Sequence, residues 1–281
     1  MTDGGGSVLS ARSDRVSPVP SPVLDCRGVS KAFGGVQALQ DFTLRVDPGA
    51  LIGLIGPNGA GKTTAFNVLT GVLRPSAGRI FVAGTDLTGK RPHVFARHGV
   101  ARTFQNIRLF PDMTVHENVM TGLHMRHGAG LAATVLGLPA FHRSEDRIAE
   151  RAAELLGVLR LSDLIDVRAG DLAYGDQRRV EIARALATEP RVLLLDEPAA
   201  GLNPHESNAL IGMIRRINGD MGIAVVLVEH DMRLVMELCQ RIHVLDHGRE
   251  LAVGTPAEVQ DDPRVVEAYL GTSAKAAHRH A

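Results

Sequence analysis

Gly56-Pro57-Asn58-Gly59-Ala60-Gly61-Lys62-Thr63 is the stretch of this 281-residue chain that decides its fold. The apolar run at residues 50–55 precedes it, and residues 62–73 follow it with apolar side chains at helical spacing. Glycines let the backbone turn tightly, so that consecutive N–H groups point inward at phosphate oxygens. A strand, a glycine-rich loop ending in Gly-Lys-Thr and a helix together predict a nucleotide phosphate loop.

The polar residues of this loop suit a nucleotide that carries a metal ion. The Lys62 ammonium can reach the β- and γ-phosphates, and the Thr63 hydroxyl can ligate Mg²⁺. The chain has no Asn-Lys-x-Asp or Thr-Lys-x-Asp segment, which a guanine site would need, so we expect ATP. The predicted nucleotide contacts are Gly56, Pro57, Asn58, Gly59, Ala60, Gly61, Lys62, Thr63 and Thr64.

Two carboxylates follow a second apolar run. Residues 192–195 predict a buried strand, and Asp196 and Glu197 come directly after it. Ligands of open α/β sheets gather at the carboxyl ends of the strands, so we expect both acids beside the phosphate loop. Asp196 would hold Mg²⁺ through a water, and Glu197 would orient or deprotonate the attacking water. The alternative is a strand that runs into a charged turn.

A histidine follows a third apolar run. Residues 223–228 predict a strand, and Glu229 and His230 come next. The carboxyl end of this strand would place His230 where it can touch a γ-phosphate. We expect most of the 12 histidines at the surface instead, including His278 and His280 near the C-terminus.

The rest of the chain predicts alternating strands and helices around a helical insert. Residues 80–83 predict a strand that completes a βαβ unit of a parallel sheet. Residues 107–166 contain no convincing strand, and Ser144 is a candidate cap for a helix that opens with Glu145 and Asp146. The later elements are a helix at 176–188, a helix from Asn203-Pro204 to Gly219, a hairpin of residues 241–246 and 250–253, and a final helix at 256–270.

Composition limits the class of protein. Apolar residues make up 44% of the chain, and 31 Lys and Arg balance 31 Asp and Glu, so no net field favours nucleic acid or anionic lipid. Cys26 and Cys239 give no disulfide framework and fit a reducing compartment. The longest apolar run, residues 131–141, is far shorter than the roughly 18 residues of a membrane span. We expect disordered tails at 1–22 and 272–281, no signal peptide, and a soluble, cytoplasmic chain.

Further segments resemble ABC transporter nucleotide-binding domains, in the right order and spacing over about residues 24–253. Residues 172–186, which begin Leu172-Ala173-Tyr174-Gly175-Asp176-Gln177, resemble the family's L-S-G-G-Q signature and the helix behind it. Gln105, in Thr103-Phe104-Gln105, matches the Q-loop, and residues 200–203 match the D-loop. His230 matches the switch histidine, and Phe33 lies where the family stacks an aromatic ring on adenine.

The resemblance implies an α/β fold: a P-loop NTPase (RecA-like) core with a mostly parallel sheet, an N-terminal antiparallel β region and an inserted α-helical subdomain. The domain would span residues 23–271, with the core at about 23–106 and 167–255, the helical subdomain at about 107–166 and the C-terminal helix at about 256–271. In this family two cassettes face each other, and each ATP lies between the phosphate loop of one and the signature of the other.

This arrangement assigns roles to the matched residues. The signature residues Ala173, Tyr174, Gly175 and Asp176 would contact nucleotide. The metal ligands would be Thr63, Gln105 and Asp196, and the catalytic residues Glu197, His230 and Gln105.

Several segments resemble the ATP-binding subunits of branched-chain amino acid importers in particular: the Leu-Ala-Tyr-Gly signature and residues 198–204, 228–232 and 266–271. An insertion around residues 125–143 is in keeping with that group. The resemblance implies membrane permease partners, a second cassette that is a paralogue or another copy, and indirectly an extracytoplasmic solute-binding protein. The chain would then lie on the inner face of the membrane, with no nucleic-acid partner. Urea or amide uptake, lipid or polysaccharide export, and a non-transport ABC ATPase acting on ribosomes or DNA stay open.

The signature departs from the family pattern at two positions. Ala173 replaces serine, which removes a hydroxyl hydrogen bond to the γ-phosphate worth about 1.5–3 kcal/mol. Asp176 replaces glutamine and adds a negative charge near the phosphate. We expect Arg178 and Arg179 to offset that charge.

Overall fold

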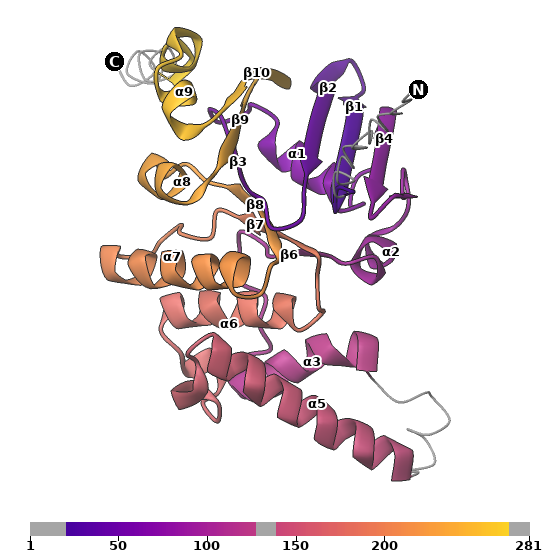
Figure 1. Ribbon diagram of the computed structural model, residues 1–281, viewed down its shortest axis with the longest axis vertical. Coiled ribbons are helices and arrows are strands. Elements are labelled where there is room, and N and C mark those ends of the chain that lie inside the picture. Colours follow the sequence, from indigo (N-terminus) through magenta and orange to yellow (C-terminus); the bar gives the residue numbers. More distant parts are fainter. Residues whose placement is uncertain (1–20, 128–138, 270–281) are drawn as a thin grey trace, which may run out of the picture.

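The computed structural model describes residues 21–127 and 139–269. Residues 1–20 and 272–281 of the two predicted tails, and residues 131–138 of the longest apolar run, lie outside the described residues. Two sheets lie together at one end of the molecule, and a group of helices forms the other end (Figure 1). Within the described residues, no helix combines the length and the apolarity needed to cross a lipid bilayer.

A six-stranded, mostly parallel sheet forms the centre of the fold. Every residue is buried in three of its strands, as expected for parallel strands covered on both faces: β3 (Leu51–Ile55), β7 (Val192–Asp196) and β8 (Ala224–Val228). The hairpin strand β10 is antiparallel to β9 and forms one edge. In spatial order the strands are β10 (Arg249–Gly254), β9 (Arg241–Asp246), β3 (Leu51–Ile55), β8 (Ala224–Val228), β7 (Val192–Asp196) and β6 (Val100–Arg102).

The alternation of side chains along the buried strands divides the core into two clusters. Leu51 and Ile55 of β3 face one cluster, which also contains the apolar sides of the helices in the second half of the chain. Ile52 and Leu54 face the other, together with helix α1 (Lys62–Leu69) and the smaller sheet. Both faces of the central sheet are therefore held by packing, which fixes the register of its strands.

The smaller sheet corrects one prediction. Residues 80–82 of the predicted strand lie in β4 (Ala77–Val82), but this strand does not complete a parallel βαβ unit with β3. It pairs antiparallel with β1 (Leu24–Phe33), in a sheet apart from β3. The first three residues of β4 are exposed, so the strand lacks the two-sided burial of a central parallel strand. The sheet order is β2 (Val36–Val46), β1 (Leu24–Phe33), β4 (Ala77–Val82) and β5 (Thr85–Asp86).

The helical end of the molecule contains α3 (Val115–His127), α5 (Pro139–Val158) and α6 (Tyr174–Leu186), with α3 packed against both of the others (Figure 1). One side of α5 is apolar and buried, with Ile148, Ala152 and Leu156 in the core. The prediction that Ser144 caps this helix is wrong, because α5 already begins at Pro139. Ser144 is buried within it, and its hydroxyl donates to the carbonyl oxygen of His127 at 2.6 Å.

Helix α7 (Pro204–Gly219) begins and ends where the sequence predicted. The predicted final helix is wrong as a single element: α9 (Pro256–Gln260) ends, and a second helical segment begins at Pro263. Pro263 has no N–H to donate, and its ring clashes with a preceding helical turn, so the helix cannot continue through it. The remaining helices of the described chain are the short α2 (Pro92–Arg97) and α8 (Met232–Leu238).

The capping box of α7 gives a stability prediction. The Asn203 side chain accepts from the Glu206 N–H at 3.0 Å, and Glu206 accepts from the Asn203 N–H at 2.9 Å. Asn203→Ala should lower the free energy of unfolding by about 1 kcal/mol, because one helix N–H loses its acceptor. Denaturant titration measures this. Asn203→Asp keeps an acceptor and should retain most of the stability; equal losses in both variants would contradict the capping role.

Candidate functional site

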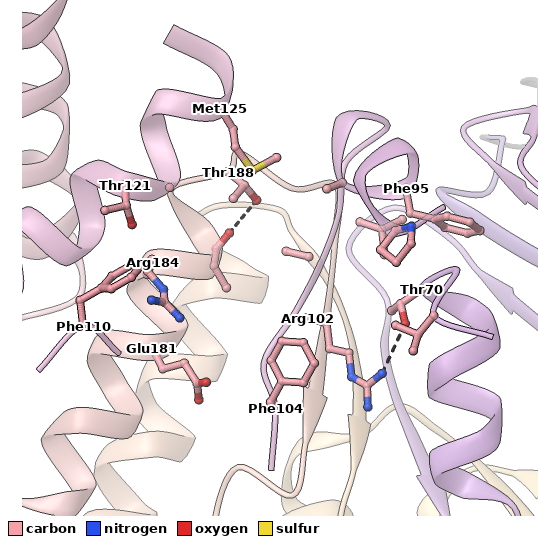
Figure 2. Close-up of a pocket in the computed structure, with 17 residues that line it drawn as sticks. Thr70, Phe95, Arg102, Phe104, Phe110, Thr121, Met125, Glu181, Arg184 and Thr188 are labelled. Atoms are coloured by element: carbon pink, nitrogen blue, oxygen red, sulfur yellow. Dashed lines mark hydrogen bonds between the residues drawn. The ribbon is translucent and has the colours of Figure 1, made fainter. Parts of the chain in front are cut away.

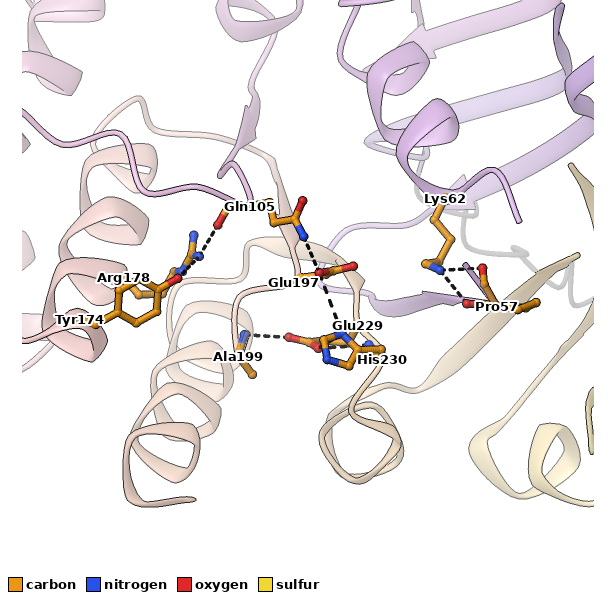
Figure 3. Close-up of polar contacts among 10 residues, drawn as sticks. Pro57, Lys62, Gln105, Tyr174, Arg178, Glu197, Ala199, Glu229 and His230 are labelled. Atoms are coloured by element: carbon orange, nitrogen blue, oxygen red, sulfur yellow. Dashed lines mark hydrogen bonds and ion pairs between the residues drawn. The ribbon is translucent and has the colours of Figure 1, made fainter. Parts of the chain in front are cut away.

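The strand register brings three predicted segments to one edge of the central sheet. Leu54 of β3 pairs with Val228 of β8, and Val228 pairs with Asp196 of β7. The three strands therefore end at one level, and the residues after them follow at the same edge: the phosphate loop, Glu197 and His230. Figure 3 shows Glu197 and His230 close together, with Lys62 facing them across the site.

Glycines in the loop are required by close backbone contacts. Gly56 has φ 148°, and a Cβ there would lie 2.1 Å from the carbonyl oxygen of Leu245. Gly61 has φ 103°, and its Cβ would lie 2.6 Å from the carbonyl oxygen of Ala38. No other residue fits at these positions without moving the backbone. The loop is thus pressed against two neighbouring segments of the chain.

Lys62 is folded back onto the loop that precedes it. Its Nζ donates to the carbonyl oxygens of Gly56 at 2.6 Å and Pro57 at 3.0 Å (Figure 3). Burial lowers the pKa of this ammonium group, and the carboxylates of Glu197 and Asp196 act in the opposite direction. The ammonium is therefore held beside the loop by carbonyls that a phosphate oxygen can replace.

A cavity of about 410 Å³ opens beside the loop. Its lining includes residues 58–64, so Thr63 and Thr64 of the predicted contacts face it, together with Glu197. The remaining lining, which the sequence did not predict, is residues 36–38 of β2 and His247-Gly248 of the β9–β10 turn. A pocket with loop N–H groups, a lysine and hydroxyls on one side can hold a phosphorylated ligand.

Glu197 contacts two of the other predicted residues, Gln105 and His230. Its carboxylate accepts a hydrogen bond from Gln105 Nε2 at 2.9 Å and lies 4.0 Å from Nδ1 of His230 (Figure 3). Its backbone has φ 46°, an unusual conformation for a residue other than glycine, and its N–H donates to the Val228 carbonyl. Strained backbone of this kind clusters at functional sites.

Glu229 is a buried residue of the site to which the sequence analysis gave no role. Its carboxylate accepts from the N–H of Ala199 at 2.7 Å and from the N–H of His230 at 3.1 Å (Figure 3). Burial raises the pKa of Glu229, and these N–H donors oppose that rise. Its position between an apolar strand and His230 was the sequence feature that could have predicted a role for Glu229 in the site. Glu229 connects the turn after Glu197 to the histidine.

Asp196 has a partner that the sequence did not predict. Arg102 Nη2 donates to Asp196 Oδ2 at 2.7 Å, and both side chains are more than nine-tenths buried. Arg102 also donates to Asn67 Oδ1 of α1 at 2.7 Å, and its guanidinium lies over the Phe66 ring. The carboxylate is therefore fixed against the helix that follows the phosphate loop. Such a partner offsets the cost of burying a carboxylate.

The signature residues do not join this cavity. Ala173 is the N-cap of α6 without a side-chain cap bond, and Tyr174 is exposed. Asp176 pairs with Arg179 at 2.8 Å, as expected, but the predicted role of Arg178 in offsetting Asp176 is wrong. Arg178 is buried and points to the backbone of the Q-loop (Figure 3).

Phe33 is exposed and does not line the cavity. It pairs across the β1–β2 hairpin with Val36, which does.

Comparison with protein families identifies the family of this chain. Residues 39–200 match the family model described as ABC transporter. The chain belongs to this family. The chain is an ATP-binding cassette that hydrolyses ATP. Residues 249–275 also match the model described as branched-chain amino acid ATP-binding cassette transporter.

Relatives and solved structures agree with this assignment. The chain is 45% identical over 250 residues to the high-affinity branched-chain amino acid transport ATP-binding protein BraF of Pseudomonas aeruginosa, covering 89% of this chain and 98% of BraF. It is 44% identical to LivG of Escherichia coli K12, with the same coverage. A nucleotide-free ATP-binding cassette superposes with a TM-score of 0.77 and 32% identity, over 88% of this chain and 98% of that one. A cassette in the ADP conformation superposes with a TM-score of 0.77 and 33% sequence identity. The match covers 89% of this chain and 99% of that one.

The buried Arg102–Asp196 pair should contribute to stability. Arg102→Met should lower the free energy of unfolding by about 3–5 kcal/mol, because it leaves a buried carboxylate without its cation. Arg102→Met combined with Asp196→Asn should recover part of that loss, since the unpaired charge is gone. Chemical denaturation measures both. Arg215→Met, in an exposed pair with Glu237, is the control and should change stability by less than about 1 kcal/mol. A similar small change for Arg102→Met would contradict the pairing.

Proposed function

We propose that this chain is the ATP-hydrolysing subunit of an importer for branched-chain amino acids. The observation that carries the solute assignment is the match of residues 249–275 to the branched-chain amino acid cassette model, beyond the general match at 39–200. The similarity to BraF and LivG over nearly their whole length supports it.

In the proposed site, the phosphates of ATP lie in the cavity beside the loop. The Lys62 ammonium exchanges its bonds to the Gly56 and Pro57 carbonyls for bonds to the β- and γ-phosphates. The loop N–H groups and the start of α1 attract the same charge. Phe33, at the end of the strand pair that borders the cavity, is the candidate to stack on adenine.

Oxygen donors near the phosphates suit Mg²⁺. The Thr63 hydroxyl lines the cavity, Asp196 lies at the end of β7, and Gln105 contributes a side-chain amide. Mg²⁺ prefers oxygen ligands, uses one or two carboxylates together with substrate phosphates, and keeps several waters. These three residues would hold the ion, which neutralises developing charge on the phosphates.

Hydrolysis is assigned to the group around Glu197. Glu197 orients and deprotonates the attacking water. Gln105 donates a hydrogen bond to the Glu197 carboxylate and holds that carboxylate in place. His230, 65% exposed, stands 4.0 Å from that carboxylate and is free to contact the γ-phosphate. The strained backbone of Glu197, with φ 46°, supports a catalytic role for this carboxylate.

The position of the signature supports a second cassette. Ala173–Asp176 begin a helix whose N-terminus favours negative charge, yet they do not line the cavity of their own chain. A second cassette, a paralogue or another copy, would bring its signature over the bound triphosphate. The Arg179 partner of Asp176 offsets the acidic charge that faces the phosphate.

An apolar groove of about 480 Å³ is the proposed contact with the membrane permease. It lies between the central sheet and the helical end of the molecule (Figure 2). Phe104, Phe110 and Met125 are exposed in it, and Arg184 provides charge. The groove adjoins Gln105, so an occupant there can influence the site. The chain would thus sit in the cytoplasm on the inner face of the membrane, and the permease would meet an extracytoplasmic solute-binding protein.

Two substitutions separate nucleotide binding from hydrolysis. Lys62→Ala should weaken ATP binding by at least about tenfold, because the buried ammonium that faces the phosphates is lost. Glu197→Gln should bind ATP normally but hydrolyse it at least about 100-fold more slowly, because the base is gone, and should trap a closed dimer. Calorimetry, phosphate release and gel filtration measure the three properties. Rapid turnover by Glu197→Gln would exclude this residue as the base.

Uptake measurements test which solute the transporter carries. Cells with this subunit and its permease should accumulate leucine, isoleucine and valine, and Glu197→Gln should abolish that uptake while the proteins are still present. Urea is the control solute. A lipopolysaccharide export ATP-binding protein, LptB of Acidithiobacillus ferridurans, is 36% identical over 89% of the chain, so export is the competing outcome. Urea uptake, or no amino acid uptake, would contradict the proposal.

A further inference from the structure

The turn between β9 and β10 places a histidine at the nucleotide cavity. His247 and Gly248 are the two residues of this turn, and both have positive φ, 46° and 80°. The flanking residues Asp246 and Arg249 pair across the hairpin. Two positive φ values in a two-residue loop are typical of a type I′ turn, whose twist matches that of the strands. The hairpin therefore fixes the backbone that carries His247.

Backbone contacts fasten this turn to two walls of the cavity. The Gly248 N–H donates to the carbonyl oxygen of Ala60 in the phosphate loop at 2.9 Å. The Gly248 carbonyl oxygen accepts from the N–H of Gln40 in β2 at 2.7 Å. A Cβ at Gly248 would lie 2.9 Å from the carbonyl oxygen of Ala38, so glycine is required there. His247 is thus held where the phosphate loop and β2 meet.

One ring nitrogen of His247 is bonded within the turn, and the other is available to a ligand. Asp246 Oδ1 lies 2.6 Å from Nδ1, which orients the ring and directs the Nδ1 proton to the carboxylate. Among the described residues, none bonds the second ring nitrogen, Nε2. The His247 side chain is 88% exposed, and the residue lines the cavity. Nε2 can therefore accept a hydrogen bond from a ligand when the ring is neutral.

The cavity lining indicates which part of a nucleotide would lie beside His247. Lys62 marks the phosphate end of the cavity. Val36, which pairs with the proposed adenine-stacking residue Phe33, marks the other end. The turn contacts both the phosphate loop and β2, and so lies between these ends. In ATP the ribose joins the adenine to the phosphates, so the ribose hydroxyls are the groups expected at this position.

We propose that His247 binds a ribose hydroxyl of the nucleotide and gives the site a preference for ribonucleotides over their deoxy analogues. A hydroxyl both donates and accepts, so it can bond Nε2 of a neutral ring or the N–H of a protonated one. A phosphate oxygen only accepts, and in the proposed site the loop N–H groups, Lys62 and Thr63 already serve it. The ribose contact is therefore separate from the phosphate contacts. This inference rests on the proposed function.

The test compares the affinities of the full chain for ADP, 2′-deoxy-ADP and 3′-deoxy-ADP by calorimetry. These diphosphates keep the ribose and are not hydrolysed, so neither turnover nor a second cassette enters the measurement. His247→Asn shortens the side chain and His247→Gly removes it, and both residues suit the positive φ of this turn. The matched control is His93→Asn, at an exposed histidine of α2 that does not line the cavity.

We expect wild type to bind ADP about threefold to tenfold more tightly than at least one deoxy analogue, the range of one hydrogen bond. In His247→Asn and His247→Gly, the affinity for ADP should fall to that for this analogue. The affinity for the analogue itself should change by less than about twofold, because it lacks the hydroxyl in every variant. His93→Asn should keep the wild-type ratio. Denaturant titration verifies that each variant is folded.

Equal wild-type affinities for the three nucleotides would overturn the inference, and so would an unchanged preference for ADP in a folded His247→Gly. An equal loss of affinity for ADP and both deoxy analogues would also overturn the ribose contact, because it would point to a phosphate contact. If neither His247 variant folds, the wild-type affinities alone decide. A wild-type chain that binds no adenine nucleotide would instead refute the proposed function.

Discussion

The nucleotide site depends on the register of three parallel strands. Because β3, β8 and β7 end level with one another, the residues that follow each strand meet at one edge: the phosphate loop, His230 and Glu197. Packing on both faces of the sheet holds this register. A shift of a single residue would turn every side chain of a strand to the opposite face and dissolve the site. The positions of the site residues at the sheet edge thus depend on the packing of the core.

Two buried arginines connect that edge to the rest of the molecule in different ways. Arg102 ties Asp196 to α1, so the carboxylate and the helix after the phosphate loop form one unit within the core. Arg178 ties the Q-loop to α6, within the helical end. Between these two units Gln105 donates to Glu197, and the apolar side of α6 packs in the same core cluster as β7 and α7.

Local signals predicted much of this structure. The glycine-rich loop, the apolar strands and the Asn203-Pro204 start of α7 depend on neighbouring residues, and each was found as expected. The failures involve distant partners or competing local signals. The sheet that β4 joins depends on β1, and Ser144 serves as a buried donor because α5 starts earlier than its polar residues suggested. The sequence around Arg102 and Arg178 does not predict their contacts. Arg102 pairs with the distant Asp196, and Arg178 donates to the distant carbonyls of Phe104 and Gln105.

The central claim is that one triphosphate is gripped by the phosphate loop of one cassette and the signature of another. The most direct measurement is a crystal structure of the full chain with a non-hydrolysable ATP analogue and Mg²⁺. The account predicts phosphates against residues 58–64, with Lys62 released from the Gly56 and Pro57 carbonyls, and residues 173–176 of a second cassette on the opposite side. A triphosphate bound elsewhere, or held in the loop of a lone chain that is fully active in solution, would contradict it.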